Sequence, residues 1–122
     1  MENWKHLKIL VVEDNKIQSF VISKLLADTG IKITNASNGK EAIDLIANEK
    51  FDIILMNIKM PVMDGFEATR EIRKFNRDVP VIAETNWGGI REKCLEEGFD
   101  DYIRKPFGRE VIIEMIKKHI KV

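Results

Sequence analysis

Five polar side chains that suit phosphate and metal chemistry each lie at the end of a short apolar segment. They are Glu13, Asp14, Asn57, Thr85 and Lys105. Two adjacent carboxylates offer the hard oxygen ligands that Mg²⁺ prefers, and a lysine ammonium group is a compact cation for a phosphoryl oxygen. Each residue also has an ordinary structural explanation, since an acid can cap a helix and an exposed lysine is usually solvated. No single one establishes a site.

The segment 51–65, with the sequence FDIILMNIKMPVMDG, gives the clearest structural signal. Its apolar run is too short for a helix and ends at Asn57, before a loop that contains Pro61 and Gly65. Such a run, bounded by turn residues, is typical of a strand buried on both faces. Ligands of open α/β sheets bind at the carboxyl ends of the strands. The residue at position 57 therefore decides what chemistry this edge can perform.

Four further strands are expected at 7–12, 31–36, from residue 80 onward and at 99–103, with amphipathic helical segments between them. In the first helix the predicted inner face contains Ile17, Phe20, Val21, Ile22, Leu25 and Leu26, and in the third it contains Phe66, Thr69, Ile72 and Phe75. Strands that alternate with helices indicate a doubly wound α/β fold. We expect a five-stranded parallel sheet in the order 2-1-3-4-5, in a flavodoxin-like three-layer sandwich with five helices. All 122 residues should form one domain.

Composition argues against several classes of partner. Lys plus Arg and Asp plus Glu both total 20, so no net field would attract nucleic acid, and direct nucleic-acid binding is not expected. Cys94 is the only cysteine and cannot form an internal disulfide. No apolar stretch approaches the roughly 20 residues of a membrane helix, and the start of the chain lacks a signal-peptide layout. These features favour a cytoplasmic protein that does not contact a membrane.

Five motifs occur in a characteristic order: VVEDN, the MPVMDG loop, a threonine closing the fourth strand, REKCLEEGFDDY and KPF. Over residues 8–120 the chain thereby resembles the receiver domains of two-component response regulators, including the chemotaxis regulators. The resemblance implies that Glu13, Asp14 and the backbone carbonyl of Lys59 support Mg²⁺, and that position 57 accepts the phosphoryl group. It also implies that Lys105 contacts that group.

The same resemblance implies how such a domain signals. Thr85 and Tyr102 would rearrange together on activation, and a downstream protein would read the surface formed by the fourth helix, fifth strand and fifth helix. The phosphoryl donor would be a sensor histidine kinase or a phosphotransfer protein. The domain would be a signalling module and not an enzyme.

Asn57 departs from this pattern, because the family has an aspartate there. An amide cannot form the acyl phosphate and is a weaker, neutral ligand for Mg²⁺, although it has nearly the shape of a carboxylate. We therefore expect a folded receiver that is not phosphorylated at its normal position and binds Mg²⁺ weakly. An engineered exchange, a natural loss of phosphoryl chemistry and a redesign for another purpose all remain open.

The segment 84–90 departs from the pattern as well. Glu84 stands where receivers usually have an apolar residue and should point away from Thr85 into a buried layer. Trp87 could anchor a partner protein or fold over its own domain, and Ile113 is a weaker candidate for the same surface. The alternative function is a phosphate-independent interaction module that uses this loop. His6 and His119 are both expected in solvent.

Overall fold

The computed structural model describes residues 2–120, which form one five-stranded parallel sheet in the order β2-β1-β3-β4-β5. The strands are β1 Lys8–Val12, β2 Lys32–Ala36, β3 Ile53–Asn57, β4 Val81–Thr85 and β5 Asp101–Arg104. All five positions of β3 and β4 are buried, whereas edge strand β2 is mostly half-buried or exposed. The predicted sheet order is confirmed.

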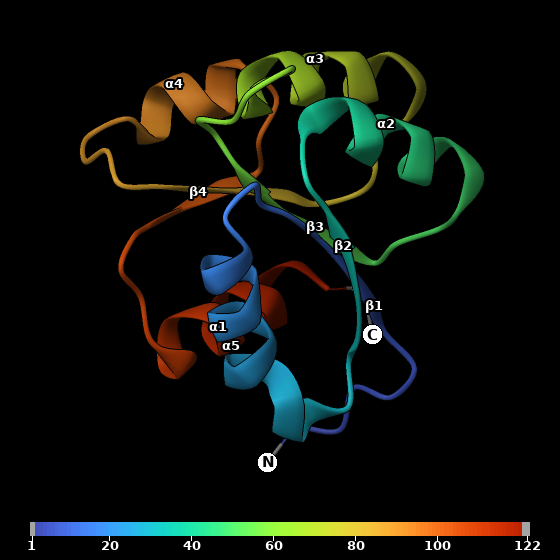
Figure 1. Cartoon of the computed structure of the whole chain (residues 1–122), viewed down its shortest axis with the longest axis vertical. Coiled ribbons are helices and arrows are strands. Elements are labelled where there is room, and N and C mark those ends of the chain that lie inside the picture. Colours follow the sequence, from blue (N-terminus) through green and yellow to red (C-terminus); the bar gives the residue numbers. More distant parts are fainter. Residues whose placement is uncertain (1, 121–122) are drawn as a thin grey trace.

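Helices cover both faces of the sheet. They are α1 Lys16–Leu26, continued by the 3-10 turn η1 Ala27–Thr29, then α2 Gly39–Asn48, α3 Gly65–Phe75, α4 Arg91–Glu96 and α5 Arg109–His119. In Figure 1, α2, α3 and α4 lie above the sheet and α1 and α5 lie below it. The predicted three-layer sandwich with five helices is therefore confirmed. Right-handed crossovers between the parallel strands are the expected reason for this arrangement.

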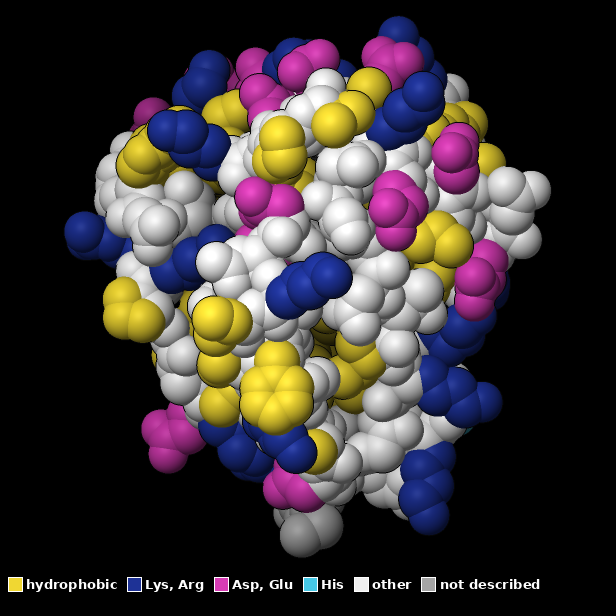
Figure 2. All heavy atoms as spheres, viewed as in Figure 1, with side chains coloured by type: hydrophobic (Ala, Val, Ile, Leu, Met, Phe, Trp, Pro, Cys, Tyr) yellow, Lys and Arg dark blue, Asp and Glu magenta, His cyan; other side chains and the backbone are white. Residues whose placement is uncertain are grey.

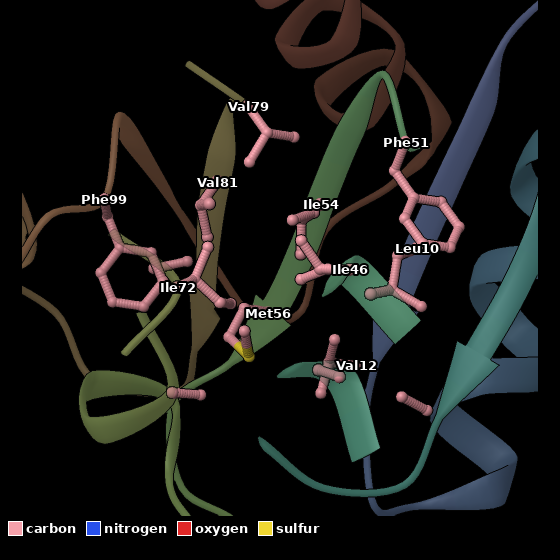
Figure 3. Packing of buried hydrophobic residues seen from close by; sticks show 14 of the residues in the cluster. Leu10, Val12, Ile46, Phe51, Ile54, Met56, Ile72, Val79, Val81 and Phe99 are labelled. Carbon is pink, nitrogen blue, oxygen red and sulfur yellow. The ribbon is translucent and has the colours of Figure 1, made fainter. Parts of the chain in front are cut away.

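Each interlayer space holds its own hydrophobic cluster. Leu10, Ile54 and Met56 belong to the cluster on the α2–α3–α4 side. In Figure 3, Ile72 and Phe99 lie at the left of this cluster and Leu10 lies at its right. The second cluster lies between the sheet and the helices α1 and α5. Burying one such aliphatic side chain contributes roughly 1.5–3 kcal/mol. These two clusters fix the strands, and hence the level at which their carboxyl ends meet.

The loop after β3 is folded tightly back onto the strand. The Met63 N–H donates to the Pro61 carbonyl at 2.8 Å, so that Val62 forms the centre of a three-residue turn with φ of 70°. A Cβ on Gly65 would lie 2.5 Å from the Asn57 carbonyl oxygen, which explains why a glycine begins α3. Asp64 caps this helix by accepting from the Glu67 N–H. The turn thereby holds the Lys59 carbonyl near Asn57.

The predicted inner faces of α1 and α3 are wider than the faces that the structure buries. On α1, Ile17 is 76% exposed and Phe20 60% exposed, and Val21 is also exposed. Figure 2 shows hydrophobic side chains at the surface over this part of the molecule. Only Ile22 and Leu26 are fully buried there. A single helix contacts the sheet along a narrower stripe than its apolar residues cover.

The expected exposure of one residue on α3 and one residue on α5 is also wrong. Phe75, at the end of α3, is 51% exposed and not inward-facing. Ile113 is only 6% exposed and packs in the α1–α5 cluster, so it is not a surface residue available to a partner.

Within residues 2–120, no helix has the length and apolar character needed to cross a membrane.

Candidate functional site

Four side chains meet at the carboxyl edge of the sheet. Glu13 and Asp14 directly follow β1, Asn57 ends β3, and Lys105 directly follows β5. Because β1 and β3 pair directly and β5 ends at the same level, residues far apart in the sequence come within hydrogen-bonding distance. The structure therefore brings together four of the five residues expected from sequence.

The Asn57 side chain lies at the centre of this group. Its Nδ2 donates at 3.1 Å to each of three oxygens: Glu13 Oε2, Asp14 Oδ1 and the backbone carbonyl of Lys59. Its Oδ1 accepts from Lys105 Nζ at 3.1 Å. Asn57 is 6% exposed, so these bonds form in a largely dry environment. The amide thus uses both ends to hold the site together.

Lys105 and Glu13 form the principal ion pair of the site. Lys105 Nζ lies 3.0 Å from Glu13 Oε1, and the two side chains are 13% and 1% exposed. Burial acts to raise the pKa of Glu13, but hydrogen bonds from Glu84, the Asn15 N–H and Lys105 outweigh it, and the pKa lies below its usual range. Glu13 is consequently a carboxylate at neutral pH.

Glu84 also belongs to this site, although its sequence position predicts only that it lies in a buried layer. It is 0% exposed, and neither of its oxygens has a hydrogen-bond donor among the described residues. Burial, and then the neighbouring Glu13 carboxylate, raise the pKa of Glu84 well above its ordinary value, although Lys105 acts in the opposite direction. Protonation of Glu84 explains why no donor faces its carboxyl group, because its own hydroxyl then donates to Glu13.

The oxygens of the site are not arranged as Mg²⁺ requires. The oxygens of Glu13, Asp14 and Lys59 are the set that the family resemblance implies as ligands, but all three accept from Asn57 Nδ2. Mg²⁺ requires oxygen ligands at about 2.0–2.1 Å in octahedral geometry, and here two amide hydrogens point into the space between these oxygens. Over residues 2–120, no group of three His, Cys, Asp or Glu side chains is arranged to hold a metal. The residues as placed do not fit the ion.

Thr85 and Tyr102 contact the loop after β4 rather than the acidic group. Thr85 Oγ1 accepts from the Trp87 N–H at 3.2 Å, and the Tyr102 hydroxyl donates to the Trp87 carbonyl at 2.9 Å. A Cβ on Gly88 would lie 2.9 Å from the Arg104 guanidinium, which packs against this loop. Trp87 is thereby held through its backbone while its side chain is 47% exposed.

Another buried acid, Asp101, lies at the start of β5 and was missed from sequence. Asp101 is 1% exposed and pairs with Arg91 from α4 and, at 3.0 and 2.8 Å, with Lys118 and His119 from α5. Burial acts to raise the pKa of Asp101, but bonds from His119, Arg91, the Tyr102 N–H and Lys118 outweigh it and lower the pKa strongly. The expectation that His119 lies in solvent is therefore wrong, because its ring contacts the Asp101 carboxylate.

Two grooves flank the acidic edge beside α1. One, of about 340 Å³, is lined by residues from α1 and from the loops after β1, β4 and β5. Those residues are Glu13, Asn15, Ile17, Gln18, Asn86, Lys105 and Pro106. The other groove, also about 340 Å³, is lined by Glu13 and Phe20 among other residues. Exposed apolar side chains of α1 thus stand next to the buried polar group.

Comparison with known proteins points to one family. Residues 9–117 match the family model described as the response regulator receiver domain. The chain is 39% identical to hybrid signal transduction histidine kinase B of Dictyostelium discoideum, over 93% of this chain but only 7% of that protein's length. It therefore spans a small part of such a relative.

Solved structures agree with this match. The receiver domain of sensor histidine kinase PA1611 from Pseudomonas aeruginosa is 38% identical, with a TM-score of 0.85 over 93% of this chain and 96% of that one. That domain holds a magnesium ion in its active-site cleft. The response regulator TrrA from Thermotoga maritima, in complex with Mg²⁺ and BeF, is 30% identical with a TM-score of 0.86, over 93% of this chain and 99% of that one.

Proposed function

The chain belongs to the response regulator receiver domain family, and from that premise we propose that it is a receiver of a two-component pathway that cannot be phosphorylated at residue 57. The observation that carries the proposal is the position of Asn57, at the end of β3 and bonded to Glu13, Asp14 and Lys105. The residues that would surround a phosphoacceptor are present, and the nucleophile is absent.

Phosphoryl transfer to such a site needs a nucleophilic oxygen, neutralisation of charge and in-line positioning. The Asn57 Oδ1 is an amide oxygen with little negative charge, and it already accepts from Lys105 Nζ. The lysine, which would otherwise stabilise a phosphoryl oxygen, also pairs with Glu13. With both groups engaged with each other, the domain stays in its unphosphorylated state.

Mg²⁺ binding by this chain is correspondingly weak in our proposal. A neutral amide is a poorer ligand than a carboxylate, and a conformation in which Asn57 Nδ2 contacts Glu13, Asp14 and Lys59 opposes a cation. The Mg²⁺ in the PA1611 receiver is a property of that protein.

Partner proteins are inferred from the exposed surfaces. We infer a sensor histidine kinase or phosphotransfer protein as the partner at the acidic edge, where Ile17 and Phe20 of α1 are exposed beside the grooves. We infer a downstream protein on the surface made by α4, β5 and α5, where Leu95 and Val111 are exposed. No direct contact with nucleic acid is part of this proposal.

The direct test compares the natural chain with Asn57→Asp, using a small acyl phosphate as phosphodonor in the presence of Mg²⁺. Intact-protein mass spectrometry should show no added phosphoryl group on the natural chain and one on Asn57→Asp. Asn48→Asp is the matched control, because it creates a carboxylate at an exposed position of α2. Stoichiometric phosphorylation of residue 57 in the natural chain would contradict the proposal.

A second candidate function is a phosphate-independent interaction module that uses the 84–90 loop. It is favoured by the way Thr85 and Tyr102 hold both backbone groups of Trp87 while the indole stays exposed. Under this hypothesis Asn57→Asp treated with phosphodonor leaves partner affinity unchanged, whereas Trp87→Ala reduces it. Under the first hypothesis phosphorylated Asn57→Asp binds the downstream partner differently.

A further inference from the structure

We propose that the side-chain NH₂ group of Asn57 occupies the position of a cation in this site, so that the site is closed to divalent metals and complete without one. This inference deepens the proposed function, because it assigns the loss of metal binding to a specific group. Weak binding could arise simply because Asn57 is a poor ligand. We infer instead that its nitrogen competes with the metal for the same three oxygens.

The first argument is the arrangement of acceptors around one nitrogen. Glu13 Oε2, Asp14 Oδ1 and the Lys59 carbonyl come from two separate loops, and each lies 3.1 Å from Asn57 Nδ2. Two of these oxygens belong to carboxylates, which favour a positively polarised neighbour. The NH₂ group is the positive end of the amide dipole, so it supplies part of the charge that a cation would supply.

The second argument is that the amide cannot turn around. Lys105 Nζ can only donate, and it lies 3.1 Å from Asn57 Oδ1. If the amide were flipped, its NH₂ would face the lysine ammonium group, and its oxygen would face three acceptor oxygens. All four favourable contacts would become repulsive. The hydrogen-bond network therefore fixes the nitrogen toward the acids.

The third argument concerns the rest of the buried charge. Glu13 is already neutralised by Lys105 at 3.0 Å and receives the Asn15 N–H at 3.1 Å. The Glu13 side chain is 1% exposed, so water does little to screen it. With these donors and the Asn57 amide in place, both Glu13 oxygens, Asp14 Oδ1 and the Lys59 carbonyl already accept hydrogen bonds, so these oxygens do not need a further cation.

The two explanations of weak metal binding predict opposite effects of Asn57→Ala. If Asn57 is a poor ligand, its removal weakens binding further or leaves it unchanged. If its NH₂ group blocks the position, removal frees the three oxygens and strengthens binding. Because one or two hydrogen bonds from Asn57 no longer compete with the metal for these oxygens, metal affinity should rise at least about tenfold.

The experiment titrates Mn²⁺ alone into the natural chain, Asn57→Ala and Asn57→Ser, and measures free Mn²⁺ by electron paramagnetic resonance, with Mg²⁺ added as competitor. We expect no saturable binding by the natural chain, and saturable, Mg²⁺-displaceable binding by both variants. Asn48→Ala, at an exposed position of α2, should behave like the natural chain. Mn²⁺ binding by the natural chain that equals or exceeds that of Asn57→Ala would overturn the inference.

A second measurement needs no substitution at residue 57. In ¹⁵N–¹H spectra of the natural chain, the Asn57 side-chain NH₂ signals should exchange slowly with solvent and should not shift when Mg²⁺ is added. Rapid exchange, or a Mg²⁺-dependent shift, would overturn the inference even if the variants failed to fold. These metal readouts are separate from the phosphorylation assay, so either proposal can fail while the other survives.

Discussion

Asn57 and Glu84 lie side by side on adjacent strands, since Asn57 pairs with Glu84 in the register of β3 and β4. Leu55 and Ile82, two positions earlier on each strand, both pack in the α1–α5 cluster, and side chains alternate along a strand. The amide and the extra acid therefore point into the same layer. An amide stands at position 57, and a carboxyl group lies beside it at position 84.

The first prediction concerns Glu84 and pH. Below about pH 4.5, the ordinary pKa of a glutamate, its carboxyl is protonated in both the folded and the unfolded chain. As pH rises, the unfolded carboxyl ionises while burial keeps the folded one protonated, and the free energy of unfolding falls until the pH reaches the folded pKa. Glu84→Gln removes this dependence and should stabilise the protein at pH 7 by on the order of 1 kcal/mol.

Urea unfolding of both proteins from pH 4 to pH 8 measures the effect. The gain from Glu84→Gln should be largest at the alkaline end and smallest near pH 4. Glu92→Gln, at an exposed position of α4, should change the stability by less than about 0.5 kcal/mol at any pH. A Glu84→Gln variant less stable than the natural chain at pH 7 would contradict the assignment of a protonated Glu84.

The second prediction concerns Asp101, which joins α4 to α5 through Arg91, Lys118 and His119. Asp101→Asn should cost about 2 kcal/mol, below the loss for a fully buried ion pair because Arg91 and Lys118 are 50% and 60% exposed. The folded pKa of Asp101 is depressed, so its contribution is present above about pH 3.8, the ordinary value, and is lost as pH falls further.

Thermal unfolding at pH 7 and at pH 3 tests this dependence. The difference between the natural chain and Asp101→Asn should shrink at the lower pH. Asp28→Asn is the control, because Asp28 pairs with Arg109 at the surface, where both side chains are more than 40% exposed, and such a pair contributes only about 0–1 kcal/mol. Equal losses for the two substitutions would show that burial of Asp101 has no special effect.

The third prediction concerns the Trp87 loop. Tyr102→Phe removes the donor to the Trp87 carbonyl, and Thr85→Val removes the acceptor for its N–H. Amide hydrogen exchange across residues 86–89 should become faster in both variants, while global stability changes by no more than about 1 kcal/mol. Thr85→Ser keeps the hydroxyl and should retain slow exchange. Unchanged exchange in both variants would mean that these bonds do not order the loop.

The fourth prediction concerns Val62, which is 77% exposed and has a φ of 70°. A β-branched residue is strained in this conformation, whereas glycine adopts it freely. Val62→Gly should therefore stabilise the protein by about 1 kcal/mol, or raise Tm by about 4 °C. Differential scanning calorimetry measures the shift, and Val62→Ala, which keeps a Cβ, should gain less. A lower Tm for Val62→Gly would contradict the strain.

Much of the fold followed from local patterns in the sequence. Apolar runs such as 53–56, ended by turn residues, predicted buried parallel strands, and the alternation of strands with helices predicted the sheet order that the structure has. The helix cap at Asp64 could also be predicted, because its residue type and its place before an amphipathic segment are local features. Local preference and long-range packing agree at these positions.

Exposure was predicted less well. The apolar residues of α1 gave the direction of its inner face but not its width, and Ile17 and Phe20 proved exposed. Ile113, a weaker candidate for the partner surface in the sequence, lies in the core. How much of a helix is covered depends on how close the neighbouring layer lies, and helix periodicity contains no information on that distance.

The sequence by itself determined that Glu13, Asp14, Asn57 and Lys105 reach a common edge, because parallel strands of similar length end at one level. Only the tertiary structure decided that Glu84 lies beside Asn57 and that Asp101 pairs with basic side chains from two helices. It also decided that the nitrogen of the Asn57 amide, and not its oxygen, faces the acids. Strand register, packing between layers and the direction of a hydrogen bond depend on neighbours distant in the chain. No local run of residues specifies them.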